Sequence, residues 1–310
     1  MFIELCRRLK EENGTVLVLA AVSMVFLVGL MALVTDAGIL YVNRIKLVNA
    51  LDTAVLAGAQ ELPANTEAAR SNAIHYAALN GVNAQEAGFE ILDDNKTIAA
   101  SGTRSINLFF ARILGHNTGQ VRANTKAHIS PASAATGVAP FGVIEDNFQY
   151  GQEVILKEGA GDGTTTRGWF GALSLGGTGA SVYSNNLLHG YTGKVEVDDE
   201  FITESGNMSQ PTKTAIEYIV SQCHDGCTPS SYDKDCPKIL IVPIVRVLTV
   251  NPAGYVFEVK VVGFGAFLVD SFVGNGNDNW VKGSFIRYVI SGEGSDTGTD
   301  FGLYSAQLSE

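Results

Sequence analysis

The chain has 310 residues, 46% of them apolar, and its 34 glycines far outnumber its 8 prolines. That apolar content supplies surface for packed cores and argues against a disordered chain. The formal net charge is −11 at pH 7, and the one close group of basic side chains is Arg7, Arg8 and Lys10. This charge argues against a nucleic-acid partner, because contacts to phosphates need clustered Lys and Arg.

Residues 15–34 form an uninterrupted apolar segment. Its length matches the ~20 residues that a helix needs to cross a bilayer and exceeds the apolar region of a cleaved signal peptide. We therefore predict a single-pass protein of the cell (inner) membrane. The nearer basic residues lie before the span, in residues 1–14, which predicts a cytoplasmic tail and periplasmic or extracellular C-terminal domains.

The apolar pattern continues beyond the span. Small and apolar residues recur there at spacings of three and four, as on one face of a helix; with Arg44 they are Leu40, Leu47, Leu51, Ala54 and Gly58. We therefore expect residues 35–60 to continue the transmembrane helix as an amphipathic rod. A helix over residues 15–59 would be roughly 65–70 Å long, and Pro63 is expected to stop or bend it.

Gly14 directly precedes the span and raises the question of processing. A short charged tail ending in glycine before a long apolar helix is similar to a prepilin leader, which would be cut between Gly14 and Thr15. Such leaders are followed by an acidic residue at the fifth mature position, whereas this chain has Leu19 there. The alternative, which we favour, is that Gly14 merely opens the helix as part of a cap.

Residues 61–130 are predicted to form a small α/β domain that caps the rod. A helix is expected over residues 66–80, and alternating apolar residues indicate strands over residues 97–107 and 119–130. A long helix with a compact sheet-bearing head is similar to pilins. Residues 131–140 contain no charged side chain and are bounded by prolines, so we interpret them as a linker.

Residues 141–310 consist of short apolar runs separated by glycine-rich turns. This pattern of short apolar runs and turns predicts a β-rich domain, either a sandwich or a barrel. One helix is expected to interrupt it, over residues 212–223, after Pro211. The predicted fold class is α+β: a transmembrane helix continuing as a long amphipathic helix, a small α/β domain and a C-terminal β-rich domain.

Three of the four cysteines, Cys223, Cys227 and Cys236, lie within fourteen residues of one another. Outside the cytoplasm we expect one disulfide, either Cys223–Cys236 or Cys227–Cys236, bracing the segment between the helix and the next strand. A reduced set is a second alternative. Zinc binding by these thiols with His224 is a third, although the spacing lacks the second ligand pair of known zinc ribbons.

Other candidate sites are explained by turns. The acidic or amide-rich turns at residues 93–95 and 275–279 lack the alternating spacing of a calcium loop, and the glycines at residues 159–163 lack the Lys and Ser or Thr of a phosphate loop. No Gly-x-Ser-x-Gly motif is present. We therefore expect no catalytic residue, metal site or cofactor, and no enzyme.

The order of residues around the helix resembles the N-terminal signature of the TadE/TadG-like Flp pilus-assembly proteins. The residues that carry it are Gly14, the apolar span, Thr35-Asp36-Ala37-Gly38, Tyr41-Val42-Asn43-Arg44 and the segment from Leu47 to Ala59. The resemblance implies a non-enzymatic membrane component of a Tad-type pilus or secretion machine.

The partners implied by this resemblance are the membrane and other pilus-assembly membrane proteins or pilin subunits, with a homo-oligomer as a further alternative. Gly29, Asp36, Arg44 and Asp52 are the expected contacts with partner helices. The alternative functions are a pseudopilin-like subunit processed after Gly14 and built into a filament, and a membrane-tethered envelope enzyme or adhesin.

Overall fold

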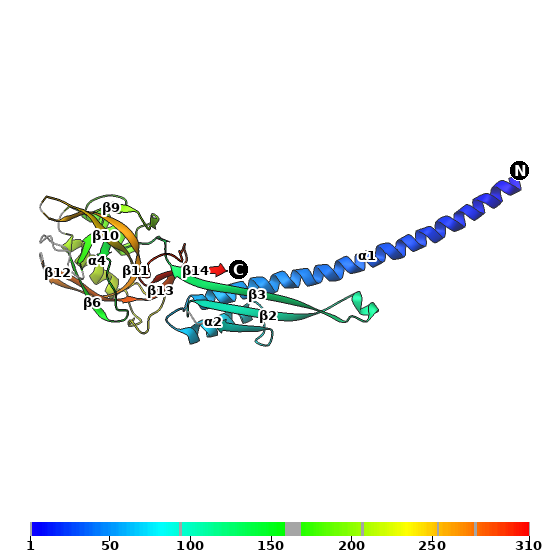
Figure 1. Ribbon diagram of the computed structural model, residues 1–310, viewed down its shortest axis with the longest axis horizontal. Helices are drawn as coiled ribbons and strands as arrows, with labels where there is room; N and C mark the ends of the chain where they lie inside the picture. The colour runs from blue at the N-terminus through cyan, green and yellow to red at the C-terminus, as the bar shows by residue number, and fades with distance from the viewer. Residues whose placement is uncertain are drawn as a thin grey trace.

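The computed structural model describes residues 2–92, 95–158, 169–205, 208–252, 254–275 and 278–309. The molecule is elongated: a long helix emerges at one end, a sheet lies along the last part of that helix, and a compact β-rich body lies at the other end (Figure 1). The fold is α+β, as predicted from the alternation of helical and strand periodicities.

Helix α1 (Phe2–Ala59) is continuous over 58 residues, which corresponds to roughly 87 Å. It ends four residues before Pro63. Leu47, Leu51, Ala54 and Gly58 are buried, so the predicted amphipathic face is confirmed in its second half. The first half projects away from the remainder of the protein (Figure 1).

A five-stranded sheet packs on the buried end of α1. Its order is β1 (Ala87–Ile91), β2 (Thr97–Asn107), β3 (Thr118–Pro131), β14 (Leu303–Ser309) and β13 (Tyr288–Ile290). Helix α2 (Thr66–Leu79) lies beside α1 and buries Ala69, Ala73 and Ala77. The two helices approach closely because Gly58 has no side chain: a Cβ there would lie 2.8 Å from the carbonyl oxygen of Ala69.

After β12 the chain leaves the far body and adds β13 and β14 to this sheet, where β14 pairs antiparallel with β3. Residues 61–130 therefore do not complete their own sheet. The segment predicted as a linker also differs from expectation: most of residues 131–140 is buried, and β4 (Ala134–Ala135) pairs with β8 (Val195–Glu196). The reason is its composition, because a segment without charged side chains can be buried once its backbone groups are paired.

The far body is a barrel. Its strands follow one another in the order β10 (Ile239–Val250), β5 (Phe141–Ile144), β7 (Trp169–Ala172), β6 (Glu153–Glu158), β12 (Asp278–Ile286) and β11 (Val256–Asn275). Strand β10 also pairs with β11, which closes the ring. Strand β9 (Glu200–Ile202) pairs antiparallel with residues 258–260 of β11. The barrel alternative of the sequence prediction is thus the observed one.

Every strand of the ring contributes to one core, as the inner face of a closed barrel requires. Helices α3 (Ala180–His189) and α4 (Ser209–Ser221) pack into the same core. Helix α4 confirms the helix expected over residues 212–223, but the expectation that it would be the only one in this region was wrong. Helix α3 was missed because it buries only Tyr183, Asn186 and Leu187, a pattern with too few apolar positions to reveal helical periodicity.

The end of α1 contacts the barrel through a loop. The Lys234 ammonium donates to the carbonyl oxygen of Gln60 at 2.9 Å and lies 3.0 Å from the Glu61 carboxylate. In the same region the Tyr288 hydroxyl donates to the carbonyl oxygen of Lys234 at 2.7 Å. The C-terminal end of the long helix is therefore fixed to the barrel by polar contacts as well as through β14.

Candidate functional site

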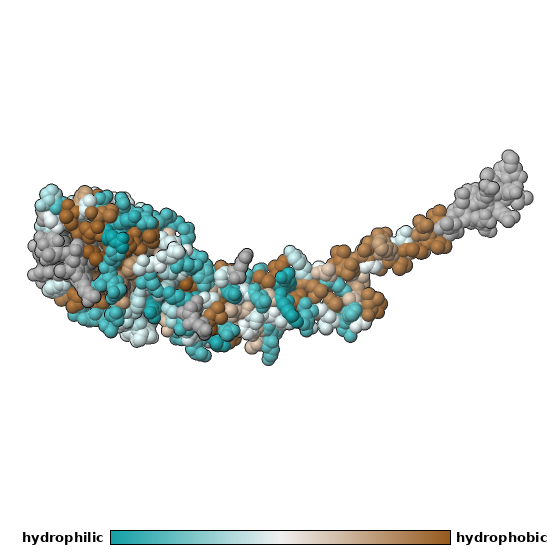
Figure 2. All heavy atoms as spheres, in the orientation of Figure 1, coloured by the Kyte–Doolittle hydropathy of each residue, from teal (hydrophilic) through white to brown (hydrophobic). Residues whose placement is uncertain are grey.

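The stretch of α1 from residue 16 to residue 34 is apolar and exposed. From residue 16 to residue 34 every side chain is exposed except Ala32, which is half-buried. Figure 2 shows this stretch as a continuous apolar surface extending from the protein. Such a surface is stable only in an apolar environment, and among the described residues α1 is the one helix long and apolar enough to cross a membrane. The segment therefore suits a membrane anchor.

Gly14 and Thr15 lie inside α1, because the helix already begins at Phe2. The interpretation of Gly14 as a residue that opens the helix is therefore wrong. Apolar and charged residues with good helix propensity on both sides of Gly14 allow the helix to continue through it. Cleavage between Gly14 and Thr15 stays a prediction.

Asp36 lies two residues beyond the apolar segment and is buried, with 6% of its surface exposed. Its two carboxylate oxygens accept hydrogen bonds from three successive backbone N–H groups, those of Phe109, Phe110 and Ala111, at 2.6–3.2 Å. These groups open the short helix η1 (Ala111–Leu114), at the end of the hairpin formed by β2 and β3. Asp36 thus fastens the hairpin to the helix just beyond the end of its apolar segment.

The hydrogen bonds also determine the ionisation of Asp36. Burial raises the pKa of its carboxyl group, but the three N–H donors stabilise the charged form, and the net pKa lies below the ordinary value for Asp. The carboxylate therefore stays ionised at neutral pH and acts as an acceptor for the start of η1, where the helix dipole favours negative charge.

The other residues predicted to contact partner helices lie before and after Asp36 in α1. Gly29 is exposed, and a Cβ there would meet nothing within 4 Å. Arg44 is exposed beside a groove that also includes Leu40 and Gln120, and Asp52 is half-buried. Because Asp36 has its partners within the chain, a contact with partner helices stays a prediction for Gly29, Arg44 and Asp52.

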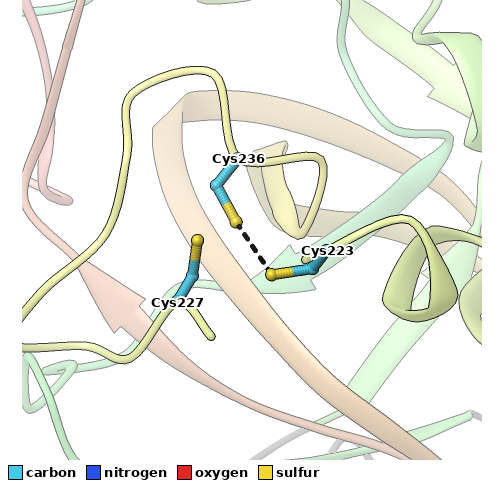
Figure 3. A group of neighbouring side chains, drawn as sticks. All are labelled: Cys223, Cys227 and Cys236. Carbon is cyan, nitrogen blue, oxygen red and sulfur yellow. Dashed lines mark hydrogen bonds between the residues drawn. The ribbon is translucent and has the colours of Figure 1, made fainter. Parts of the chain in front are cut away.

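The three cysteines converge in the loop between α4 and β10 (Figure 3). Their sulfur atoms all lie within 4.8 Å of one another, and the Cys223 and Cys236 Sγ atoms are 3.8 Å apart. All three cysteines are free in the structure. His224 is exposed, and it is not part of the group. The geometry thus brings together three of the four ligands considered for zinc.

The environment makes the thiols of Cys223 and Cys236 unequal in acidity. A hydrogen bond from the backbone N–H of Cys227 lowers the pKa of Cys223 most. Together with hydrogen bonds from the Cys227 and Cys236 side chains and the charge of Lys238, it outweighs the opposing effect of burial. Burial, together with a hydrogen bond to the Cys227 side chain, raises the pKa of Cys236 to about 12. Cys223 is therefore the better nucleophile at neutral pH, and Cys236 stays a thiol.

Some of the other sequence candidates lie outside the described residues. These are Asp93 and Asp94, the glycine-rich residues 159–163, and positions 276 and 277. The functional feature that sequence reasoning missed is the end of the β2–β3 hairpin. Its signal was present as Leu108, Phe109, Phe110, Ile113 and Leu114, an apolar cluster in a turn where polar residues are usual.

Comparisons with known proteins give a match for the region of the long helix and none for the barrel. No curated protein matches the chain, and no solved structure does. One family model matches, over residues 14–61. This range covers the exposed apolar segment, Asp36 and the buried end of α1. The N-terminal helix region of this chain is therefore similar to the Tad family, whose model is described as Flp pilus-assembly TadE/G-like.

Proposed function

We propose that this protein is a non-enzymatic, membrane-anchored component of a Tad-type (Flp) pilus assembly or secretion system and that it acts by binding. One observation carries the proposal: the family-matched segment is a single helix, exposed and apolar in its first half and buried in a sheet core in its second. The cytoplasmic end is the N-terminus, and the sheet and barrel lie outside the inner membrane.

The division of α1 also restricts where partners bind. Positions such as Leu47, Leu51 and Ala54 are buried against the protein's own sheet, so partner helices reach the exposed part of α1 only. Within the membrane, helices associate by close packing at small residues. The open space around Gly29 makes it the point of closest approach for a partner helix.

Photo-crosslinking in a piliated host tests this proposal. Benzoylphenylalanine replaces Val28, which is 56% exposed next to Gly29, or Leu51, which is fully buried. We expect position 28 to give an adduct with another membrane protein of the Tad system and position 51 to give none. Pili that assemble normally after deletion of the gene would overturn the proposal.

A pair of glycine variants separates binding from anchoring. Gly29 and Gly38 both lie in α1, and a Cβ at either position would meet nothing within 4 Å, so Leu at either position leaves the fold intact. We expect Gly29→Leu to reduce piliation in the complemented deletion strain and Gly38→Leu to preserve it, with equal amounts of both variants in the membrane. Equal piliation in the two strains contradicts a packing role for Gly29.

A further inference from the structure

The end of the β2–β3 hairpin, residues 108–115, carries large apolar side chains on its surface. We call this segment the hairpin tip. Phe109, Ile113 and Leu114 are 71%, 83% and 81% exposed. Strands β2 and β3 have 11 and 14 residues and carry the tip away from the barrel, along α1 (Figure 1). The tip therefore reaches toward the exposed apolar part of α1.

Two contacts fix the tip beside the helix. The carboxylate of Asp36 accepts the N–H groups of Phe109, Phe110 and Ala111. One turn further along α1, Leu40 packs against β3 at Gly119, where a Cβ would lie 2.9 Å from the Leu40 Cδ2 atom. The height of the tip along α1 is therefore set by the fold.

That height coincides with the membrane boundary. Residues 15–34 span roughly 30 Å as a helix, the thickness of the hydrocarbon core. Asp36 follows about 3 Å further along the axis, within the headgroup layer that extends roughly 5–8 Å beyond the core on each side. Figure 2 shows the apolar surface of the tip beside the apolar surface of α1, so the two surfaces meet the same side of the bilayer.

The charge of the tip fits this layer. Residues 105–120 contain one fully charged side chain, Arg112, and no carboxylate, although the protein as a whole has a net charge of −11. Apolar side chains accompanied by a cationic one are typical of segments that bind the interface between headgroups and acyl chains. The carboxylate of Asp36 lies at the same height along α1, and it already accepts hydrogen bonds from backbone N–H groups of the tip.

We propose that the hairpin tip inserts into the headgroup layer of the membrane that α1 spans, with Phe109, Ile113 and Leu114 in contact with lipid. The protein then has two membrane contacts, and the second prevents the sheet from rotating about the axis of α1. This inference rests on the membrane placement of α1 in the proposed function.

Lipid photo-crosslinking of the full-length protein tests the proposal. The protein is reconstituted in nanodiscs of phosphatidylethanolamine and phosphatidylglycerol, with benzoylphenylalanine at position 28, 113 or 74. Val28 lies in the apolar part of α1, Ile113 in the tip, and Ile74 is 43% exposed on α2. We expect lipid adducts at positions 28 and 113 by mass spectrometry and none at position 74.

The three positions separate the possible failures. Adducts at position 28 without adducts at position 113 would overturn the tip proposal and leave the membrane anchor intact. Absence of lipid adducts at position 28 would overturn the anchor itself, and the tip proposal with it. An adduct between position 113 and a second copy of the chain, in place of lipid, would identify the tip as a protein interface and also overturn the proposal.

Discussion

Asp36 joins parts of the chain that are 73 to 75 residues apart. In the sequence it appears as the polar residue that ends an apolar segment. In the structure both of its oxygens hold the end of a hairpin. A single carboxylate thus sets the position of the β2–β3 hairpin relative to the membrane anchor, and it is suited to this task because it accepts several N–H groups at once.

Replacement of Asp36 by Asn tests this attachment. Asn keeps the size of the side chain but substitutes an NH₂ donor for one carboxylate oxygen, so at least one N–H group of the tip loses its acceptor. We expect amide hydrogen exchange at residues 109–111 to become on the order of tenfold faster. Asp52→Asn, in the half-buried part of the same helix, is the control. Unchanged exchange in Asp36→Asn would show that the hydrogen bonds do not hold the tip.

The unequal thiols give a prediction about reactivity. In the reduced protein, Cys223 is expected to react with iodoacetamide before Cys236, because its lowered pKa gives it the larger thiolate fraction at neutral pH. Cys236 is expected to react slowly, because its pKa of about 12 leaves almost no thiolate below pH 10. Peptide mass spectrometry of samples quenched over time measures the order. Faster labelling of Cys236 than of Cys223 at pH 7 contradicts the assigned environments.

At the scale of single elements, the contact between α1 and α2 depends on one missing side chain. A Cβ at Gly58 would lie 2.7 Å from the Ile98 Cδ1 atom and 2.8 Å from the Ala69 carbonyl oxygen. The Ile98 methyl group can move, but the α2 backbone cannot move without disturbing the alanines that pack beside it. The spacing of small residues in both helices is thus a requirement of close packing.

Gly58→Ala is therefore expected to lower the free energy of unfolding by about 1–3 kcal/mol, as overpacking in a core does. Gly38→Ala provides the comparison in the same helix, since its Cβ meets nothing within 4 Å. Alanine there is expected to leave stability unchanged or raise it by up to about 1 kcal/mol. Denaturant unfolding of the full-length variants in detergent measures both. Equal stability of the two variants would show that α2 yields to the added methyl group.

At the scale of the whole molecule, the sheet and the barrel are joined more tightly than two domains with a linker. The backbone of residues 131–140 donates to partners in other segments: Ala132 N–H to the carbonyl oxygen of Leu303, and Ala139 N–H to that of Ile241. Strands β13 and β14 then return the chain to the first sheet. Separating the two parts requires the loss of both sets of hydrogen bonds.

Limited proteolysis checks this union. Elastase, which cuts after small residues, is expected to cut residues 131–140 slowly despite their many alanines, because most of them are buried and paired. Any fragments produced by a cut there are expected to co-elute on size exclusion, because β14 still pairs with β3. Two fragments that separate under native conditions would contradict a shared sheet.

The sequence predicted those features that depend on local periodicity. The long helix, its buried face at Leu47, Leu51 and Ala54, and the β-rich character of the C-terminal part follow from apolar spacing. It did not predict the insertion of β14 beside β3 or the contact between Asp36 and the tip. Both join residues far apart in the chain. The local sequence around a strand or a carboxylate does not indicate which distant residues will contact it.

The cysteine cluster could be predicted from the sequence in part. Its three members were identified because they are close in sequence, and the loop between α4 and β10 brings their sulfur atoms together. The difference in acidity between Cys223 and Cys236 depends on burial and on one backbone N–H. Neither the burial nor this hydrogen bond can be predicted from the sequence, because both depend on how the loop folds.

Helix α1 continues without a break from its apolar segment into the sheet core, so a change in the tilt of the first part also tilts the second. No hinge separates the span from residues 35–59, whose helical length is roughly 37 Å. A tilt of the span by about 20°, the average for transmembrane helices, would displace the upper end of this arm sideways by roughly 13 Å. Because that end is fixed to the barrel at Lys234, a partner that changes the tilt of the helix in the membrane also moves the barrel.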